Sequence, residues 1–111
     1  MNVNPLIISA LSSLNLPDEP NHYEGTATEY ITFNYVDERP SLRADDTDIY
    51  DETTIQVHYF TKGNPQPNKK AIRRLLRASG FTIISTSEFY ESDTKFNHIV
   101  VEAWIEGVIQ D

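Results

Sequence analysis

Cysteine is absent from the 111 residues of the sequence. That absence excludes disulfide bonds, thiolate catalysis and zinc or iron–sulfur sites that depend on cysteine ligands. The four glycines are scattered, so the sequence offers no glycine-rich loop for binding phosphate. Residues 1–16 lack a basic segment, and their apolar stretch is too short and too interrupted for a signal peptide or a membrane span. We therefore expect a protein that is made and kept in the cytosol.

Basic side chains are also few, with 9 lysines and arginines against 17 acidic residues, and the formal net charge is −8. A uniformly acidic surface would disfavour contact with nucleic-acid backbones and anionic membranes. The apolar fraction of 39% and the aromatic fraction of 11% are large enough for one packed core. The length predicts a single domain that spans residues 1–111.

The hydrophobic pattern predicts six elements in the order helix, strand, strand, helix, strand, strand. Asn4 is expected to cap the first helix, with Pro5 at its first position and a hydrophobic staple between Val3 and Ile8. Residues 15–28 contain two prolines and a glycine, and we interpret them as a surface connection. The six elements are placed at about residues 4–14, 29–36, 53–62, 68–79, 81–90 and 98–109.

Each predicted strand is apolar on one face and each predicted helix along one stripe, so strands and helices can bury one another. The simplest arrangement is an α+β two-layer sandwich, in which a mostly antiparallel four-stranded sheet has both helices on one face. The third strand is expected to place Phe81, Ile83 and Phe89 on one face. The far face of the sheet is more aromatic than a water-facing surface needs to be, so we expect a second surface to cover part of it. This far face is predicted to carry Tyr30, Val36, Phe60, Val100 and Trp104.

The three histidines give no sign of a catalytic or metal site. His22, His58 and His98 are scattered, and none lies four residues from another as in a helical metal-binding pair. His58 and His98 share a strand face and could meet across the sheet, but we interpret them as partly exposed strand histidines. The serines do not form a nucleophile-elbow pattern. The sequence therefore predicts no catalytic residue, no metal site, no cofactor and no enzymatic activity.

Residues 45–52 form an acidic stretch whose alternate carboxylates could share a hard cation. The stretch lacks the central glycine of the helix–loop–helix calcium motif, and its spacing does not match that motif. We interpret it as part of a solvated acidic loop between residues 37 and 52, and fortuitous Ca²⁺ or Mg²⁺ binding remains the alternative. A loop of about fifteen residues is long for a hairpin connection, and such loops are usually functional or mobile.

Charge is divided unevenly along the chain. Seven acidic residues lie between positions 37 and 52, where only Arg39 and Arg43 are basic. Five of the 9 basic residues lie on the predicted second helix, and no acidic residue occurs between positions 53 and 87. Like charges four residues apart on a helix repel by roughly a few tenths of a kcal/mol per pair, so a nearby acidic group would stabilise the helix.

Three kinds of partner would offset this repulsion: counter-ions or acids of the same chain, a nucleic acid, or the acidic loop of an identical neighbour. We adopt the third as a hypothesis, because a head-to-tail contact between loop and helix can close into a ring. Such a contact steers subunits together at low salt and weakens as the salt concentration rises. The candidate subunit interface consists of Asp45, Asp46, Asp48, Asp51, Glu52, Lys69, Lys70, Arg73, Arg74 and Arg77.

Several short motifs occur in a fixed order along residues 29–106. A strand YITFNYV leads into a charged loop with Arg39-Pro40, a strand QVHYF precedes the second helix, and Gly-Phe opens the third strand. The final strand follows Tyr90, Glu91, Asp93 and Thr94. In order and spacing this region resembles the small tail-completion or tail-terminator proteins of long-tailed bacteriophages and prophages, a family of head–tail joining proteins.

The resemblance implies two helices packed on a small sheet and a structural role without catalysis. It implies a hexameric ring at the head-proximal end of the tail, which ends growth of the tail tube and joins the tail to the head connector. The implied partners are identical subunits, the tail-tube protein and the connector or stopper protein, while DNA passes through the pore without specific binding. The implied location is the virion tail, assembled in the host cytoplasm without a membrane.

Two alternatives remain open: another head–tail joining or tail-tube component, and an acidic DNA-binding or DNA-mimic regulator. Within a ring, we expect the acidic loop to lie towards the lumen or a subunit joint and the basic helix to face a neighbour, because a basic pore would hold DNA. We also expect residues 38–52 to become ordered on assembly.

Overall fold

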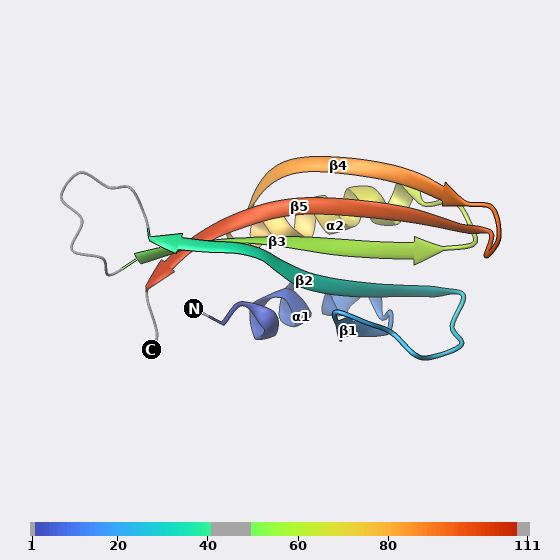
Figure 1. The fold of residues 1–111 in the computed structure, drawn as a ribbon, viewed down its shortest axis with the longest axis horizontal. Helices are drawn as coiled ribbons and strands as arrows, with labels where there is room; N and C mark the ends of the chain where they lie inside the picture. Colours follow the sequence, from blue (N-terminus) through green and yellow to red (C-terminus); the bar gives the residue numbers. More distant parts are fainter. Residues whose placement is uncertain (1, 41–49, 109–111) are drawn as a thin grey trace.

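The computed structural model describes residues 2–40 and 50–108. It contains one five-stranded sheet in the order β1-β2-β3-β5-β4, with both helices on the same face (Figure 1). The predicted α+β class is therefore confirmed, while the predicted four-stranded sheet gains a fifth, parallel strand. The elements are α1 (Asn4–Leu11), a 3₁₀ turn η1 (Ser12–Leu14), β1 (Asp18–Pro20), β2 (Glu29–Pro40), β3 (Tyr50–Thr61), α2 (Gln66–Ala78), β4 (Thr82–Glu91) and β5 (Phe96–Val108).

The additional strand is β1, which lies in the segment that we predicted to be a surface connection. β1 pairs in parallel with residues 31–33 of β2. The pairing is closed on both sides, since the Ile31 amide donates to the Pro17 carbonyl and the Asn21 amide donates to the Phe33 carbonyl, each at 2.8 Å. A strand of three residues that ends in proline has no alternating pattern, and it exists because the edge of β2 offers it hydrogen bonds.

The first helix begins one residue away from its predicted cap. Val3, not Asn4, is the N-cap residue, so Pro5 is the second residue of the helix and not, as we predicted, the first. The predicted staple is wrong, because Val3 is buried while Ile8 is 41% exposed. The Val3 amide instead donates to the Tyr35 hydroxyl at 2.6 Å, so a long-range contact with β2 fixes the start of the helix.

The acidic connection between β2 and β3 is shorter than we predicted, because both strands continue into it. The two strands pair as far as Pro40 and Asp51, past a β-bulge between Tyr35 and Asp37. Together with the end of β5 they form an arm that projects beyond the helices (Figure 1). These ends of the strands were not predicted because their residues are polar and do not alternate with apolar ones. Charge pairs accompany the pairing instead: Arg39 lies opposite Glu52, and its guanidinium forms an ion pair with Asp37.

A second bulge, between Ile83 and Ser85 of β4, overturns one prediction about the sheet faces. Ile83 lies opposite Ala103 on the helix-covered face, as expected. Beyond the extra residue the alternation is inverted, so Phe89 points to the far face and is 56% exposed. A bulge shifts every later side chain by one position, and the sequence alternation alone could not reveal it.

The core lies between the sheet and the two helices. Ile72 and Leu76 of α2 are fully buried and Leu75 is partly buried, which confirms the predicted apolar stripe. Gly80 ends α2 with a φ of +101°, a left-handed conformation that favours glycine. No helix among the described residues is long and apolar enough to span a membrane. The other buried apolar side chains are Val3, Ile7, Leu11, Ile31, Phe33, Ile55, Val57, Tyr59, Phe81, Ile99, Val101, Ala103 and Ile105.

Candidate functional site

The far face of the sheet carries a continuous line of neighbouring rings, which we call the aromatic row; four of the rings are stacked, and the last is tilted against its neighbour. Strand pairing places Tyr30, Phe60, His98 and Phe89 side by side across four strands. Their successive ring centroids lie 4.7, 4.2 and 5.9 Å apart. Tyr23, from the connection after β1, stacks on the outer face of Tyr30 at 4.4 Å. Five rings therefore cross the sheet from one edge to the other.

The stacking limits what the aromatic row can bind. Tyr30 and Phe60 each have two stacked neighbours, and His98 has Phe60 stacked on one side and the tilted ring of Phe89 on the other, so the open ring faces of the row lie at Tyr23 and Phe89. Proteins that hold single-stranded nucleic acid present open ring faces on which bases stack, and the middle of this row presents none. The row is therefore suited to contacts at its two ends.

His58 meets His98 of the aromatic row, as the strand pattern allowed. His58 Nδ1 lies 2.9 Å from His98 Nε2, and His58 Nε2 lies 2.9 Å from Asn34 Oδ1. A carbonyl oxygen only accepts, so His58 Nε2 carries the hydrogen and His58 Nδ1 accepts from His98 Nε2. His98 Nδ1 is then left without a hydrogen, 3.8 Å from a carboxylate oxygen of Glu91.

Both histidines are poor bases in this setting. Burial lowers the pKa of His58, and repulsion from a protonated His98 lowers it further. Burial also lowers the pKa of His98, partly opposed by the carboxylate of Glu91. The first proton taken up therefore belongs on His98 Nδ1, where Glu91 can pair with it. Within residues 2–40 and 50–108, no three histidine or carboxylate side chains converge in a group that could hold a metal ion.

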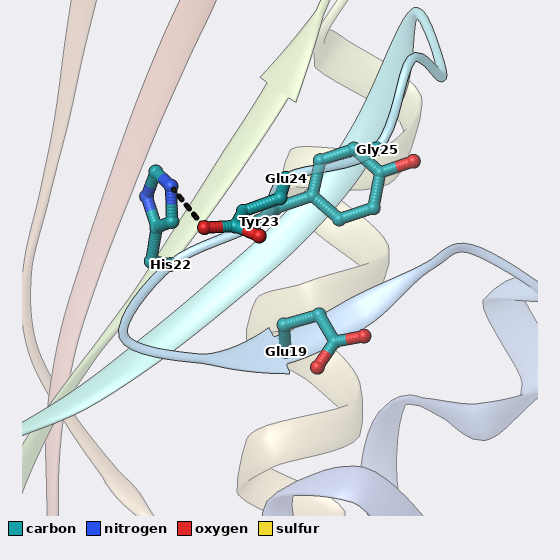
Figure 2. A pocket seen from close by; sticks show the side chains of 5 residues that line it. All are labelled: Glu19, His22, Tyr23, Glu24 and Gly25. Atoms are coloured by element: carbon teal, nitrogen blue, oxygen red, sulfur yellow. Dashed lines mark ion pairs between the residues drawn. The ribbon is translucent and has the colours of Figure 1, made fainter.

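An open hollow of about 500 Å³ lies at the Tyr23 end of the aromatic row (Figure 2). It is lined by Glu19, His22, Tyr23, Glu24 and Gly25, and His22 lies 3.9 Å from Glu24. Tyr23 folds back over its own loop, and its hydroxyl accepts from the Ala27 amide at 3.2 Å.

Gly25 is required for the way in which Tyr23 lies. A Cβ atom on Gly25 would lie 2.0 Å from the Tyr23 hydroxyl oxygen, a distance that real contacts do not reach. A side chain at this position would therefore push Tyr23 off Tyr30. Sequence reasoning missed both the hollow and the first ring of the row, and the only signal was a tyrosine two residues before a glycine.

A smaller hollow, of about 210 Å³, is lined by Glu88, Phe89, Tyr90, Asn97 and Ile99, and by the strand register all of these except Phe89 lie on the helix-covered face. Of the far-face residues that we predicted, Tyr30 and Phe60 belong to the row, and Val100 and Trp104 are partly buried on the same face. Val36 lies in the bulge of β2 and is 48% exposed.

The acidic half of the predicted subunit interface is only partly described. Asp45, Asp46 and Asp48 lie outside the described residues. Asp51 and Glu52 are strand residues of β3, opposite Pro40 and Arg39, and not loop residues as we predicted.

The basic half lies on α2, which packs on β4 and β5. Lys69 forms an ion pair with Glu88 of β4 at 2.5 Å, so one acid of the same chain does offset the charge of the helix. This hydrogen bond, with a second from Gln66, lowers the pKa of Glu88. Lys70, Arg74 and Arg77 are exposed; Arg73 is partly buried, and its buried Nε has no hydrogen-bond partner among the described residues.

Comparison with known proteins shows the fold alone. No protein-family model matches the sequence, and no curated protein sequence matches it. Among solved structures, the chain is similar to one from the virion of a native gene transfer agent particle, with a TM-score of 0.51 and 11% sequence identity. The match covers 94% of this chain and 87% of the other, so the likeness extends over the whole domain.

Proposed function

We propose that this chain is a structural subunit of a phage-type virion that acts by contacts and not by catalysis. The observation that carries the proposal is the shared fold with a virion chain, because the match includes nearly all of both chains. The resemblance of residues 29–106 to tail-terminator proteins supports the finer role. In that role the protein forms a ring at the head-proximal end of the tail, ends growth of the tail tube and joins the tail to the head connector.

The distribution of charge supports assembly from identical copies. The bases of α2 lie on the β4 side of the domain, where α2 packs. Acidic residues are numerous on the opposite side, with Asp18 and Glu19 on β1, Glu24 beside it, and Asp37 and Glu38 on the outer part of β2, while the acids of β4 are Glu88, which pairs with Lys69, and Glu91. A head-to-tail arrangement brings unlike sides together at every subunit boundary and closes into a ring when the rotation allows. Within this proposal, the acidic arm lies at the joint or the lumen, where it would not retain passing DNA.

Electron microscopy of the purified protein, alone and with tail tubes, tests the function. Closed rings that cap tube ends are the expected result. Long filaments would indicate a tube subunit instead, and a monomer that neither forms rings nor caps tubes would contradict the proposal. A gel shift with DNA that weakens as salt rises would favour the DNA-binding alternative.

A charge reversal on α2 tests the hypothesis that loop and helix make the contact. Arg77→Glu should weaken ring formation at low salt and have less effect as ionic strength approaches 1 M, where the screening length falls to about 3 Å. Lys95→Glu makes the same charge change in the β4–β5 turn, away from α2, and serves as the matched control. Equal behaviour of the two variants by light scattering would reject a specific role for the basic helix.

A further inference from the structure

The two ends of the aromatic row lie on opposite edges of the sheet, at the same position along the strands. Tyr30, Phe60, His98 and Phe89 are direct partners across β2, β3, β5 and β4. Tyr23 continues the row beyond β2, while Phe89 ends it on β4, which is an edge strand. A copy of the domain placed beside β4 without a shift along the strands therefore brings its Tyr23 next to Phe89.

The directions of the strands also continue across such a boundary. The order β2-β3-β5-β4 consists of antiparallel neighbours, so β4 runs opposite to β2. A second copy beside β4 would present its edge strand β1, which is parallel to β2 and would therefore run antiparallel to β4. Because this requires a rotation about an axis roughly parallel to the strands, the same operation can repeat around a ring.

A second row of cross-strand partners also has exposed apolar side chains at both edges of the sheet. Tyr35, Ile55, Ala103 and Ile83 are partners across the same four strands. At its β2 end, Tyr35 and Val36 are 37% and 48% exposed, and at its β4 end Ile84 is 50% exposed. Of the six exposed large hydrophobic side chains in the described structure, five lie on β2 or β4, and the sixth is Ile8. Such pairs of patches on opposite edges mark an interaction surface.

We propose that Phe89 of one copy enters the hollow beside Tyr23 of the next copy and stacks on the open face of that ring. The inference deepens the proposed ring function and rests on it. The contact joins the aromatic rows of neighbouring subunits into one belt and buries the two ring faces that the monomer leaves open.

Single substitutions at the β4 end test the contact. Phe89→Ala should raise the concentration at which rings dissociate about tenfold or more, because a buried aromatic anchor is lost. Phe89→Tyr keeps the ring and should assemble like the parent protein. Ile8→Ala is the matched control, since Ile8 is also an exposed large hydrophobic side chain but lies on α1, away from β2 and β4. Mass photometry gives the assembly midpoint, and urea unfolding shows that the variants remain folded.

Cross-linking shows which surfaces meet, because the chain has no cysteine of its own. The double variant Glu24→Cys with Ser87→Cys places one thiol beside the hollow and one on the far face of β4. A short bis-maleimide should then give a ladder of linked subunits up to the full ring. Each single variant should give only monomer. Dimers from Ser87→Cys alone would show a two-fold contact between β4 edges and would overturn the proposal.

The outcomes separate this contact from the function on which it rests. Rings that dissociate at the same concentration with Phe89→Ala as without it refute the contact and leave the ring function intact. Filaments that depend on Phe89 support the contact and refute the terminator role. A protein that remains monomeric in the presence of tail tubes refutes both.

Discussion

The hydroxyl group of Tyr59 gives the sharpest test of how the basic helix is held to the sheet. Tyr59 of β3 is buried, and its hydroxyl donates to the carboxylate of Glu29 at the start of β2. It also accepts from the side-chain amide of Asn68, in the first turn of α2, at 3.0 Å. Burial, and secondly the bond to Glu29, raise the pKa of Tyr59, so the hydroxyl keeps its proton at neutral pH. Three elements therefore depend on one oxygen atom.

Replacing Tyr59 with phenylalanine removes that oxygen and keeps the ring, so no cavity forms in the core. A hydrogen bond to a charged group contributes about 1.5–3 kcal/mol to stability. The Asn68 amide also reaches Glu29, at 3.3 Å, so the carboxylate keeps one donor. The loss should therefore lie at the lower end, about 1.5–2 kcal/mol. With a urea dependence of about 1–3 kcal/mol per molar, the unfolding midpoint should fall by about 1 M.

Urea unfolding followed by the fluorescence of Trp104, the single tryptophan, measures this loss. Tyr90→Phe is the matched control, because the Tyr90 ring is exposed and its hydroxyl group should contribute less than about 0.5 kcal/mol. In a Glu29→Ala background, Tyr59→Phe should cost much less, which isolates the pairwise interaction. A loss below about 0.5 kcal/mol in the parent protein would refute the assigned role of the hydroxyl.

Two further predictions concern the far face of the sheet. Gly25→Ala should displace Tyr23 from the aromatic row, lower the near-ultraviolet dichroism of the tyrosines and weaken ring assembly, while far-ultraviolet dichroism keeps the sheet signal. Because the pKa values of His58 and His98 are lowered from 6.5 on folding, the unfolded chain binds more protons below that pH. The free energy of unfolding should thus decrease as the pH falls from 6.5 to 5. Replacing both histidines with glutamine should make this decrease smaller. An equal decrease in the parent protein and the double variant would contradict the lowered pKa values of the buried pair.

Sequence patterns predicted the elements whose side chains alternate or recur without interruption. α2 has one buried stripe and β5 one buried face, as predicted, because burial of one face requires that periodicity. The pattern failed at Phe89, since the bulge after Ile83 inverts the alternation through hydrogen bonding to β5. It also failed at β1, whose three residues carry no periodic signal and pair only because β2 is already in place.

The candidate sites also divide into one that the sequence predicts and one that depends on strand pairing. The basic helix could be read from Lys69 to Arg77, because five charges on one short segment are visible without a fold. The aromatic row could not, since its rings come from the connection after β1 and from four strands. Register decides which residues become neighbours across strands, and a slip of one residue would separate them all. The meeting of His58 with His98 is of this kind, a diagonal contact between strands 40 positions apart in the chain.

The sequence by itself determined the class of fold, the absence of cysteine chemistry and the separation of acidic from basic segments. Those properties depend on composition and local periodicity, which act over a few residues. The tertiary structure alone decided that the rings form one line, that the line ends on opposite edges, and that Gly25 makes room for Tyr23. Each of those features depends on strand order and register, and these are fixed only when distant segments bury a common core.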